Sequence, residues 1–96
     1  MFDADFEWDD ANRAHLRSHQ VTQEEFEQVI RNGAFDLDYE AESGEGRYKS
    51  VGVTGKGRIL LVVWTVRNGR IRAVTSYRAP KRLQEYFLDN SGWQRS

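Results

Sequence analysis

The spacing of apolar residues divides the chain into a helical N-terminal part and a longer part made of strands. Between residues 9 and 33, apolar positions recur every three or four residues, which places them on one side of a helix. From Phe35 onward, apolar and polar residues alternate, as in strands that bury one face. The pattern predicts the order helix, helix, four strands, helix.

Capping chemistry marks the ends of the two N-terminal helices. Asp9 is expected to cap a helix that runs to about residue 19, because its carboxylate can accept a backbone N–H. Thr22 and Glu25 have the spacing of a capping box at the start of the second helix. Asn32-Gly33 provides a left-handed stop at its end.

The strands are expected at residues 35–40, 47–54, 58–67 and 70–77, with polar residues 40–46 forming a loop. Asn68-Gly69 is typical of a type I′ hairpin turn, since both positions favour positive φ. Gly55-Lys56-Gly57 is interpreted as a three-residue loop that pairs Thr54 with Arg58. A two-residue loop is the alternative, and it would turn Arg47 and Lys49 toward the buried side, where burial is costly.

A closing helix is predicted after Pro80, which is favoured in a first helical turn. Leu83, Tyr86 and Phe87 follow at spacings that form a docking stripe. Runs of strands after runs of helices predict an α+β fold, with a four-stranded antiparallel sheet, two N-terminal helices and one C-terminal helix. Residues 1–96 are taken as one domain, with a core at about 6–88 and a polar tail at 89–96.

Strand alternation predicts what each face of the sheet carries. One face is nearly all apolar, is expected under the helices, and includes Tyr77 opposite Leu60. The other face carries the basic side chains Arg47, Lys49, Arg70, Arg72 and Arg78. Paired guanidinium donors suit the phosphates of RNA or DNA, whereas the alternative is a solvated face that carries charge for solubility.

Composition and charge narrow the classes of protein. The 96 residues contain no Cys, which excludes disulfides, thiolate catalysis and Cys-bound zinc. The longest apolar run, residues 59–64, is too short for a membrane span and no signal peptide opens the chain, so we expect a cytoplasmic protein. Residues 1–45 hold thirteen acidic and three basic residues, a net charge of −10, whereas residues 46–96 hold eleven basic and two acidic residues, a net charge of +9. The basic half is therefore the one expected to attract a polyanion, and the alternative is that the two blocks face each other in the fold.

Three blocks of residues resemble one family. They are Phe6-x-Trp8-Asp9-x-x-Asn12-x-x-His15-x-x-x-His19-x-Val21, then Gly44-Glu45-x-Arg47-Tyr48-x-x-x-Gly52-x-Thr54-x-x-Gly57-Arg58-x-Leu60, and finally Gly69-x-Ile71-Arg72-x-x-Thr75. In this order and at these spacings, the chain resembles the BrnT-type toxins (the DUF497 family) of bacterial type II toxin–antitoxin modules. The resemblance covers about residues 6–87.

The resemblance implies a RelE-like fold and an endoribonuclease that needs no metal or other cofactor and inhibits translation. It also implies a separate antitoxin of the ribbon-helix-helix, DNA-binding type, which neutralises the toxin, and a homodimer is an option within that complex. The RNA 2′-hydroxyl would attack the adjacent phosphate, so the protein must move protons and stabilise phosphate charge.

Site residues are carried over by matching position. The resemblance implies catalytic roles for Arg47, Arg72, Arg58, Glu45 and His19. Tyr77 stands where the family has an arginine and Arg78 follows it, so both join the catalytic candidates. The RNA-binding candidates are Lys49, Arg70, Lys81 and Arg82. We expect the arginine side chains to converge on a single pocket.

Several alternatives stay open at this point. Tyr77 and Leu83, in place of the family's arginine and glutamate, favour a second hypothesis, a catalytically inactive module that binds RNA or protein. His15 and His19, four residues apart, could bind a metal, bond locally near the helix end, or act as acid and base. Glu45 could be a base or could pair with a neighbour.

Overall fold

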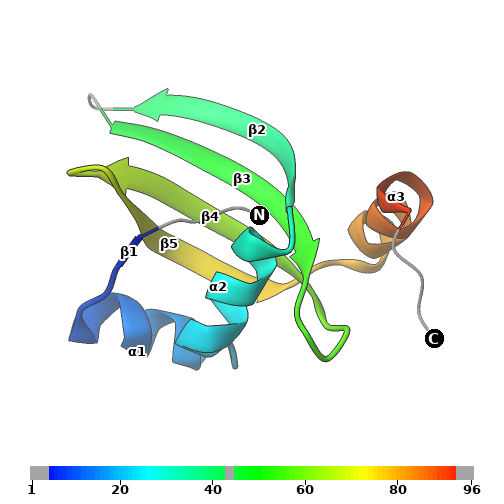
Figure 1. Ribbon diagram of the computed structural model, residues 1–96, viewed down its shortest axis with the longest axis horizontal. Coiled ribbons are helices and arrows are strands. Elements are labelled where there is room, and N and C mark those ends of the chain that lie inside the picture. The colour runs from blue at the N-terminus through cyan, green and yellow to red at the C-terminus, as the bar shows by residue number, and fades with distance from the viewer. Residues whose placement is uncertain (1–4, 43–44, 93–96) are drawn as a thin grey trace.

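The sheet is ordered β1-β5-β4-β3-β2, with β1 parallel to β5 and the other pairs antiparallel (Figure 1). The computed structural model describes residues 5–42 and 45–92. Its elements are β1 (Phe6–Glu7), α1 (Asp10–Ser18), α2 (Gln23–Arg31), β2 (Phe35–Glu42), β3 (Glu45–Val53), β4 (Ile59–Arg67), β5 (Arg70–Arg78) and α3 (Lys81–Ser91). The predicted α+β fold and element order are confirmed, except that the short β1 makes the sheet five-stranded instead of four-stranded.

The predicted caps of α1 and α2 are present. The Asp9 carboxylate accepts the backbone N–H of Asn12 at 2.9 Å, and the Asn12 side chain accepts the backbone N–H of Asp9 at 2.9 Å. Thr22 and Glu25 form the corresponding reciprocal pair at the start of α2. Gly33, with φ of +85°, follows the last turn of α2, as the left-handed stop predicts.

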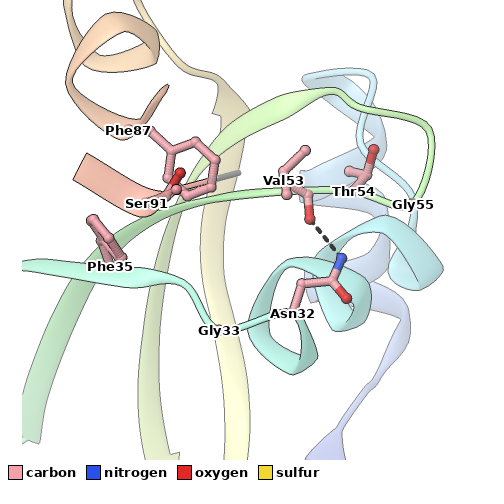
Figure 2. A pocket seen from close by; sticks show the side chains of 9 residues that line it. Asn32, Gly33, Phe35, Val53, Thr54, Gly55, Phe87 and Ser91 are labelled. Carbon is pink, nitrogen blue, oxygen red and sulfur yellow. Dashed lines mark hydrogen bonds between the residues drawn. The ribbon is translucent and has the colours of Figure 1, made fainter. Parts of the chain in front are cut away.

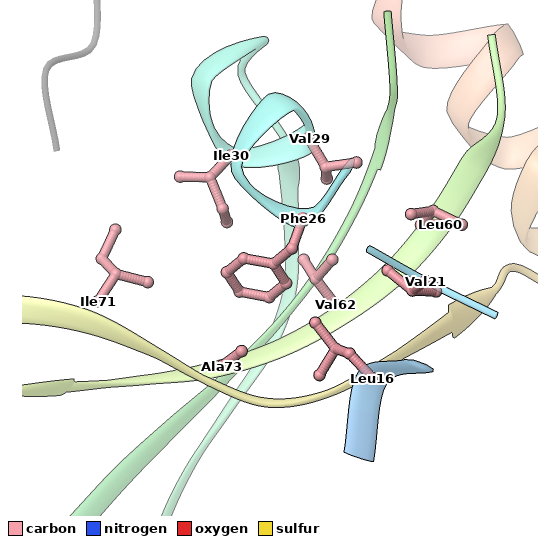
Figure 3. Packing of buried hydrophobic residues seen from close by; sticks show 9 residues of the cluster. All are labelled: Leu16, Val21, Phe26, Val29, Ile30, Leu60, Val62, Ile71 and Ala73. Carbon is pink, nitrogen blue, oxygen red and sulfur yellow. The ribbon is translucent and has the colours of Figure 1, made fainter. Parts of the chain in front are cut away.

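The helices α1 and α2 cover one face of the sheet, which we call the helix face. Figure 3 shows Phe26 of α2 pointing toward Val62 and Ala73 on the strands. The buried cluster consists of Leu16, Val21, Phe26, Val29, Ile30, Leu60, Val62, Ile71 and Ala73. Each member is at most 7% exposed, so burial of these apolar side chains is the main stabilising contribution to this layer.

A smaller core fixes α3 to the far end of the sheet (Figure 1). Phe87 is 3% exposed and packs with Val51, Val53, Ile59 and Ala79. Leu83 is partly buried against this cluster, but Tyr86 is 47% exposed, so the predicted docking stripe was wrong for Tyr86. The reason is that α3 meets the sheet at the C-terminal end of β3 and the starts of β2 and β4, where Leu83 and Phe87, four positions apart, make the buried contacts. No helix in the described ranges is long and apolar enough to cross a membrane.

The hairpin turns follow their sequence signals, but one predicted loop is a strand pair. Asn68 and Gly69 have φ of +53° and +76°, as a type I′ turn requires. Thr54 pairs with Arg58 across a three-residue loop, with the Thr54 N–H donating to the Arg58 carbonyl at 2.8 Å. The loop predicted at residues 40–46 was wrong, because β2 continues to Glu42 and β3 begins at Glu45. The two strands stay paired as far as Glu42 and Glu45, and Glu40 lies opposite Arg47 in this register.

A β-bulge in β5 reverses the predicted faces of two site residues. Trp64 pairs with Ala73 and Val63 with Thr75, which leaves Val74 as an extra residue. One extra residue shifts the alternation of every later side chain. Tyr77 therefore pairs with Leu61 and Arg78 with Leu60, so the predictions that Tyr77 lies on the helix face and Arg78 on the basic face were wrong.

Candidate functional site

The face opposite the helix face gathers basic residues from two strands, β3 and β5. One row of residues crosses the sheet on this side. Glu40 pairs with Arg47, and Arg47 lies opposite Thr65, one position beyond the Tyr48–Trp64 pair. Thr65 in turn pairs with Arg72, and Arg72 with Glu7. Strands lie about 4.8 Å apart, which separates the Arg47 and Arg72 backbones by about 10 Å. We call this side, defined by Arg47, Lys49, Arg70 and Arg72, the arginine face. The predicted grouping of these four residues is confirmed by the register.

Arg72 is held in place by two carboxylates. Its Nη1 donates to Glu7 Oε1 at 3.1 Å, and its Nη2 lies 2.8 Å from Asp9 Oδ2. The hydrogen bond to Asp9 raises the pKa of Arg72. The pKa of Asp9 is lowered, first by the backbone N–H of Asn12 and then by Arg72. The guanidinium is therefore oriented before any ligand arrives, although its charge is shared with Glu7 and Asp9.

The other members of the arginine face are more available. Lys49 Nζ lies 3.6 Å from Glu40 Oε1, an ion pair in which both side chains are more than 40% exposed. Arg47 and Arg70 are exposed, and neither makes an ion pair within the part of the chain that the structure describes. Exposed cations beside an oriented guanidinium suit a chain of phosphates.

A second group lies along the outer side of β5, beside α1. His15 Nε2 is 3.1 Å from Thr75 Oγ1, the rings of His15 and His19 have centroids 5.2 Å apart, and those of His19 and Tyr77 are 6.0 Å apart. We call His15, His19, Thr75 and Tyr77 the edge cluster. Imidazole and phenol groups in contact can pass protons to and from a ligand. Thr75 and Lys49 both pair with Val63, so the edge cluster and the arginine face share a row of the sheet.

Arg58 lies elsewhere, and the expected convergence of all the arginines on a single pocket was wrong. Its Nη1 donates to Glu25 Oε2 at 2.6 Å and to the Gln20 carbonyl at 3.1 Å. Arg58 precedes β4 and Arg72 pairs with Thr65, seven residues further along. At about 3.3 Å per residue, this separates them by about 23 Å.

The carboxylate that holds Arg58 is itself perturbed. Burial acts to raise the pKa of Glu25, but the hydrogen bond from the Thr22 backbone N–H and the contact with Arg58 outweigh it, so the pKa is lowered. Glu25 therefore stays ionised to lower pH than an ordinary glutamate, and joins the α2 cap to Arg58.

The remaining candidates are scattered. Arg78 is exposed at the end of β5, and Lys81 and Arg82 are exposed in the first turn of α3. Glu45 belongs to β3, but its side chain is outside the described residues. In the described ranges, no group of three or more His, Asp or Glu side chains is placed to hold a metal, so the His15–His19 pair has no third ligand there.

A cavity of about 420 Å³ lies between α2, β3 and α3 (Figure 2). In the wall of this cavity, the side-chain Nδ2 of Asn32 donates to the Val53 carbonyl at 2.9 Å. The lining residues are Asn32, Gly33, Phe35, Val53, Thr54, Gly55, Phe87, Ser91 and Gly92. None of them carries a charge or a group suited to acid–base chemistry, so the arginine face and the edge cluster are the better site.

Sequence reasoning missed the partners of Arg72 and His15. Asp9 was recognised only as a helix cap, and Glu7 pairs with Arg72 only because β1 joins the sheet beside β5. The contact between His15 and Thr75 joins residues sixty positions apart. Neither pairing has a local sequence signal.

Comparison with known proteins identifies one family. A family model described as "Ribonuclease toxin, BrnT, of type II toxin-antitoxin system" matches residues 8–82, more than three quarters of the chain. The matched range contains His19, Arg47, Arg58, Arg72 and Tyr77. No curated protein matches the chain.

Proposed function

Because the chain belongs to the BrnT family, and is therefore a ribonuclease toxin of a type II toxin–antitoxin system, we propose that it binds RNA along the arginine face and cleaves it beside the edge cluster. The predicted family, toxin function and enzyme class are confirmed by this match. The observation that carries the proposal is the shared row of the sheet, which joins Lys49 through Val63 to Thr75 and so to His15.

The arginine face would hold the RNA backbone. Arg47, Lys49 and Arg70 would bind phosphates, and Arg72 would add an oriented guanidinium. Tyr77 pairs with Leu61 and Arg72 with Thr65, four residues along β4. Tyr77 and Arg72 are therefore about 13 Å apart along the strand direction, a span that a few nucleotides can cover. Lys81 and Arg82 would extend the basic surface on α3.

The edge cluster would move the protons. Cleavage without metal requires that the 2′-oxygen attack the adjacent phosphorus while the bond to the 5′-oxygen breaks, which leaves a 2′,3′-cyclic phosphate and a 5′-hydroxyl. We assign His19 to take the proton of the 2′-hydroxyl and Tyr77 to supply one to the departing 5′-oxygen. Glu45, Arg58 and Arg78 keep their catalytic roles as untested predictions, with Glu45 as the alternative base.

The toxin acts with a cognate antitoxin, as its family implies. We propose further that this antitoxin is of the ribbon-helix-helix, DNA-binding type, that the toxin inhibits translation in the cytoplasm, and that a toxin homodimer can form within the complex. These finer statements rest on the resemblance of the motifs in the sequence.

The test uses purified toxin and single-stranded RNA, with EDTA in one arm and Mg²⁺ in the other. Cleavage should proceed equally in both arms. Arg47→Gln should lower kcat/KM about 10- to 100-fold, the value of a charge-assisted hydrogen bond, and His19→Asn should lower kcat about 10²- to 10⁴-fold. Lys56→Gln removes the same charge from the exposed 55–57 loop and should leave cleavage unchanged.

Three results would contradict the assignment. They are loss of cleavage in EDTA, full activity of both Arg47→Gln and Arg72→Gln, and full activity of His19→Asn. A wild-type protein that binds RNA but leaves it intact would favour the inactive binding module.

A further inference from the structure

Part of the helix face is not covered by α2 and carries a ladder of aromatic rings. Tyr39, Tyr48 and Trp64 come from β2, β3 and β4 and are paired in register. The rings of Tyr39 and Tyr48 are 4.7 Å apart, and those of Tyr48 and Trp64 are stacked at 4.4 Å with 16° between their planes. Tyr39 is 52% exposed, and Val66, two residues beyond Trp64, is 50% exposed.

A glycine in the strand beneath the ladder leaves room for the Tyr39 ring. Gly46 lies under the Tyr39 ring, and a Cβ at this position would collide with that ring. The rings are thus packed against the sheet and against one another, so they lose little conformational freedom when a partner covers them.

Beside the ladder is a cavity of about 380 Å³, between α2 and the strands, with one anchored carboxylate. It is lined by Ile30, Gly33, Ala34, Asp36, Ser50 and Trp64. Trp64 Nε1 donates to Ser50 Oγ at 3.1 Å, and Ser50 Oγ donates to Asp36 Oδ1 at 2.9 Å. The chain of hydrogen bonds holds the exposed Asp36 carboxylate at the side of an otherwise mostly apolar cavity.

We propose that this surface, the aromatic ladder of Tyr39, Tyr48 and Trp64 together with Val66 and Asp36, is where the cognate antitoxin docks. The occupant is an amphipathic segment of the antitoxin that lays apolar side chains on Tyr39 and Trp64 and brings a Lys or Arg to Asp36. The proposal rests on the existence of an antitoxin, which family membership implies, and does not depend on where RNA is cleaved.

Three observations favour an antitoxin segment as the occupant. Clustered Tyr and Trp side chains are the residue types that dominate binding energy at protein interfaces. Asp36 is the charged residue among those that line the cavity beside the ladder, and its carboxylate favours a basic partner. The same charge disfavours RNA, whose phosphates would meet Asp36, and the exposed arginines Arg47 and Arg70 lie on the opposite face.

The test measures the affinity of the purified toxin for the protein encoded by the reading frame adjacent to its gene. Tyr39→Ser should weaken binding about tenfold or more, as loss of an aromatic anchor does. Asp36→Asn keeps the acceptor for Ser50 but removes the charge, and should weaken binding and reduce its dependence on salt. The matched controls are Tyr86→Ser, an equally exposed tyrosine on α3, and Asp38→Asn, which lies in the same strand but pairs with Lys49 on the other face.

Each outcome decides the proposal. It is supported if Tyr39→Ser and Asp36→Asn weaken binding, the two controls bind like wild type, and all variants keep their urea midpoints and cleave RNA normally. It is overturned if Tyr39→Ser binds the antitoxin within about twofold of wild type, or if Asp38→Asn weakens binding as much as Asp36→Asn. It is also overturned if Tyr39→Ser instead loses RNA affinity, or only dissociates a toxin dimer. Failure of the cleavage assignment would leave these affinities unchanged, so the two proposals are tested separately.

Discussion

Neutralising either Arg58 or Glu25 should loosen α2 from the hairpin that follows β3. The two side chains meet at 2.6 Å, with 38% and 20% of their surfaces exposed, and Glu25 also accepts the backbone N–H of Thr22 at 3.0 Å. Glu25→Gln keeps this acceptor and removes only the charge, because Gln also serves in a capping box. Arg58→Met keeps most of the length of the side chain and removes the guanidinium. The pair of substitutions therefore isolates the ion pair from the cap.

The magnitude follows from the geometry. A partly exposed ion pair is worth about 1 kcal/mol, so Glu25→Gln should lower the free energy of unfolding by about 1 kcal/mol. Arg58→Met should lower it by about 1.5 kcal/mol, since the hydrogen bond to the Gln20 carbonyl is also lost. The double variant should lose about 1.5 kcal/mol, which leaves a coupling energy of about 1 kcal/mol. In a domain of this size, that coupling corresponds to about 4–8 °C in Tm.

Urea unfolding, monitored by tryptophan fluorescence, measures the stability of the wild type, the two single variants and the double variant, which together form a double-mutant cycle. Glu24→Gln removes a neighbouring exposed charge from the same helical turn and should change stability by less than about 0.5 kcal/mol. A coupling energy below about 0.3 kcal/mol would refute the reasoning, because independent sites add within that range. Cleavage by folded Arg58→Met tests the predicted catalytic role separately.

The pH dependence has a defined sign. The pKa of Glu25 is lowered from the ordinary value of 4.5, so the folded state holds its proton less tightly than the unfolded state. The stabilisation is complete above pH 4.5 and is lost as the pH falls through the lower pKa of the folded protein. The stability difference between wild type and Glu25→Gln should therefore shrink only in acid. A difference that stayed constant down to acid pH would contradict the assignment.

Two further substitutions test the core and the hairpin. Phe26→Ala should lower the free energy of unfolding by about 3–5 kcal/mol, because it leaves a cavity where the fully buried ring packs edge-on against Phe6 and Trp8. A loss below about 2 kcal/mol in urea unfolding would show that the core relaxes to fill this cavity. Gly69→Ala should lower the free energy of unfolding by about 1 kcal/mol. The φ angle of Gly69 is +76° and open space surrounds the position, so only backbone strain opposes the added methyl group. An unchanged thermal midpoint would show that the turn changes type without cost.

The sequence by itself determined the elements whose signals are local. The capping pair Thr22 and Glu25, the turn at Asn68-Gly69 and the three-residue loop before Arg58 each depend on residues at most four positions apart. Their chemistry works in any fold that keeps those few residues together. For the same reason, Arg47, Lys49, Arg70 and Arg72 could be assigned to one face, since alternation and two short turns set their register.

Only the tertiary structure decided how the site is completed. One extra residue in β5, Val74, moves Tyr77 to the face of Leu61 and Arg78 to that of Leu60, and no residue type marks a bulge there. Arg72 is joined to Glu7 because β1 pairs with β5 across more than sixty residues, and His15 reaches Thr75 across sixty. Such contacts depend on how α1 and β1 pack against the edge of the sheet. The sequence therefore determined which residues share a strand or a turn, whereas packing between distant segments decided which charges are paired and which remain exposed.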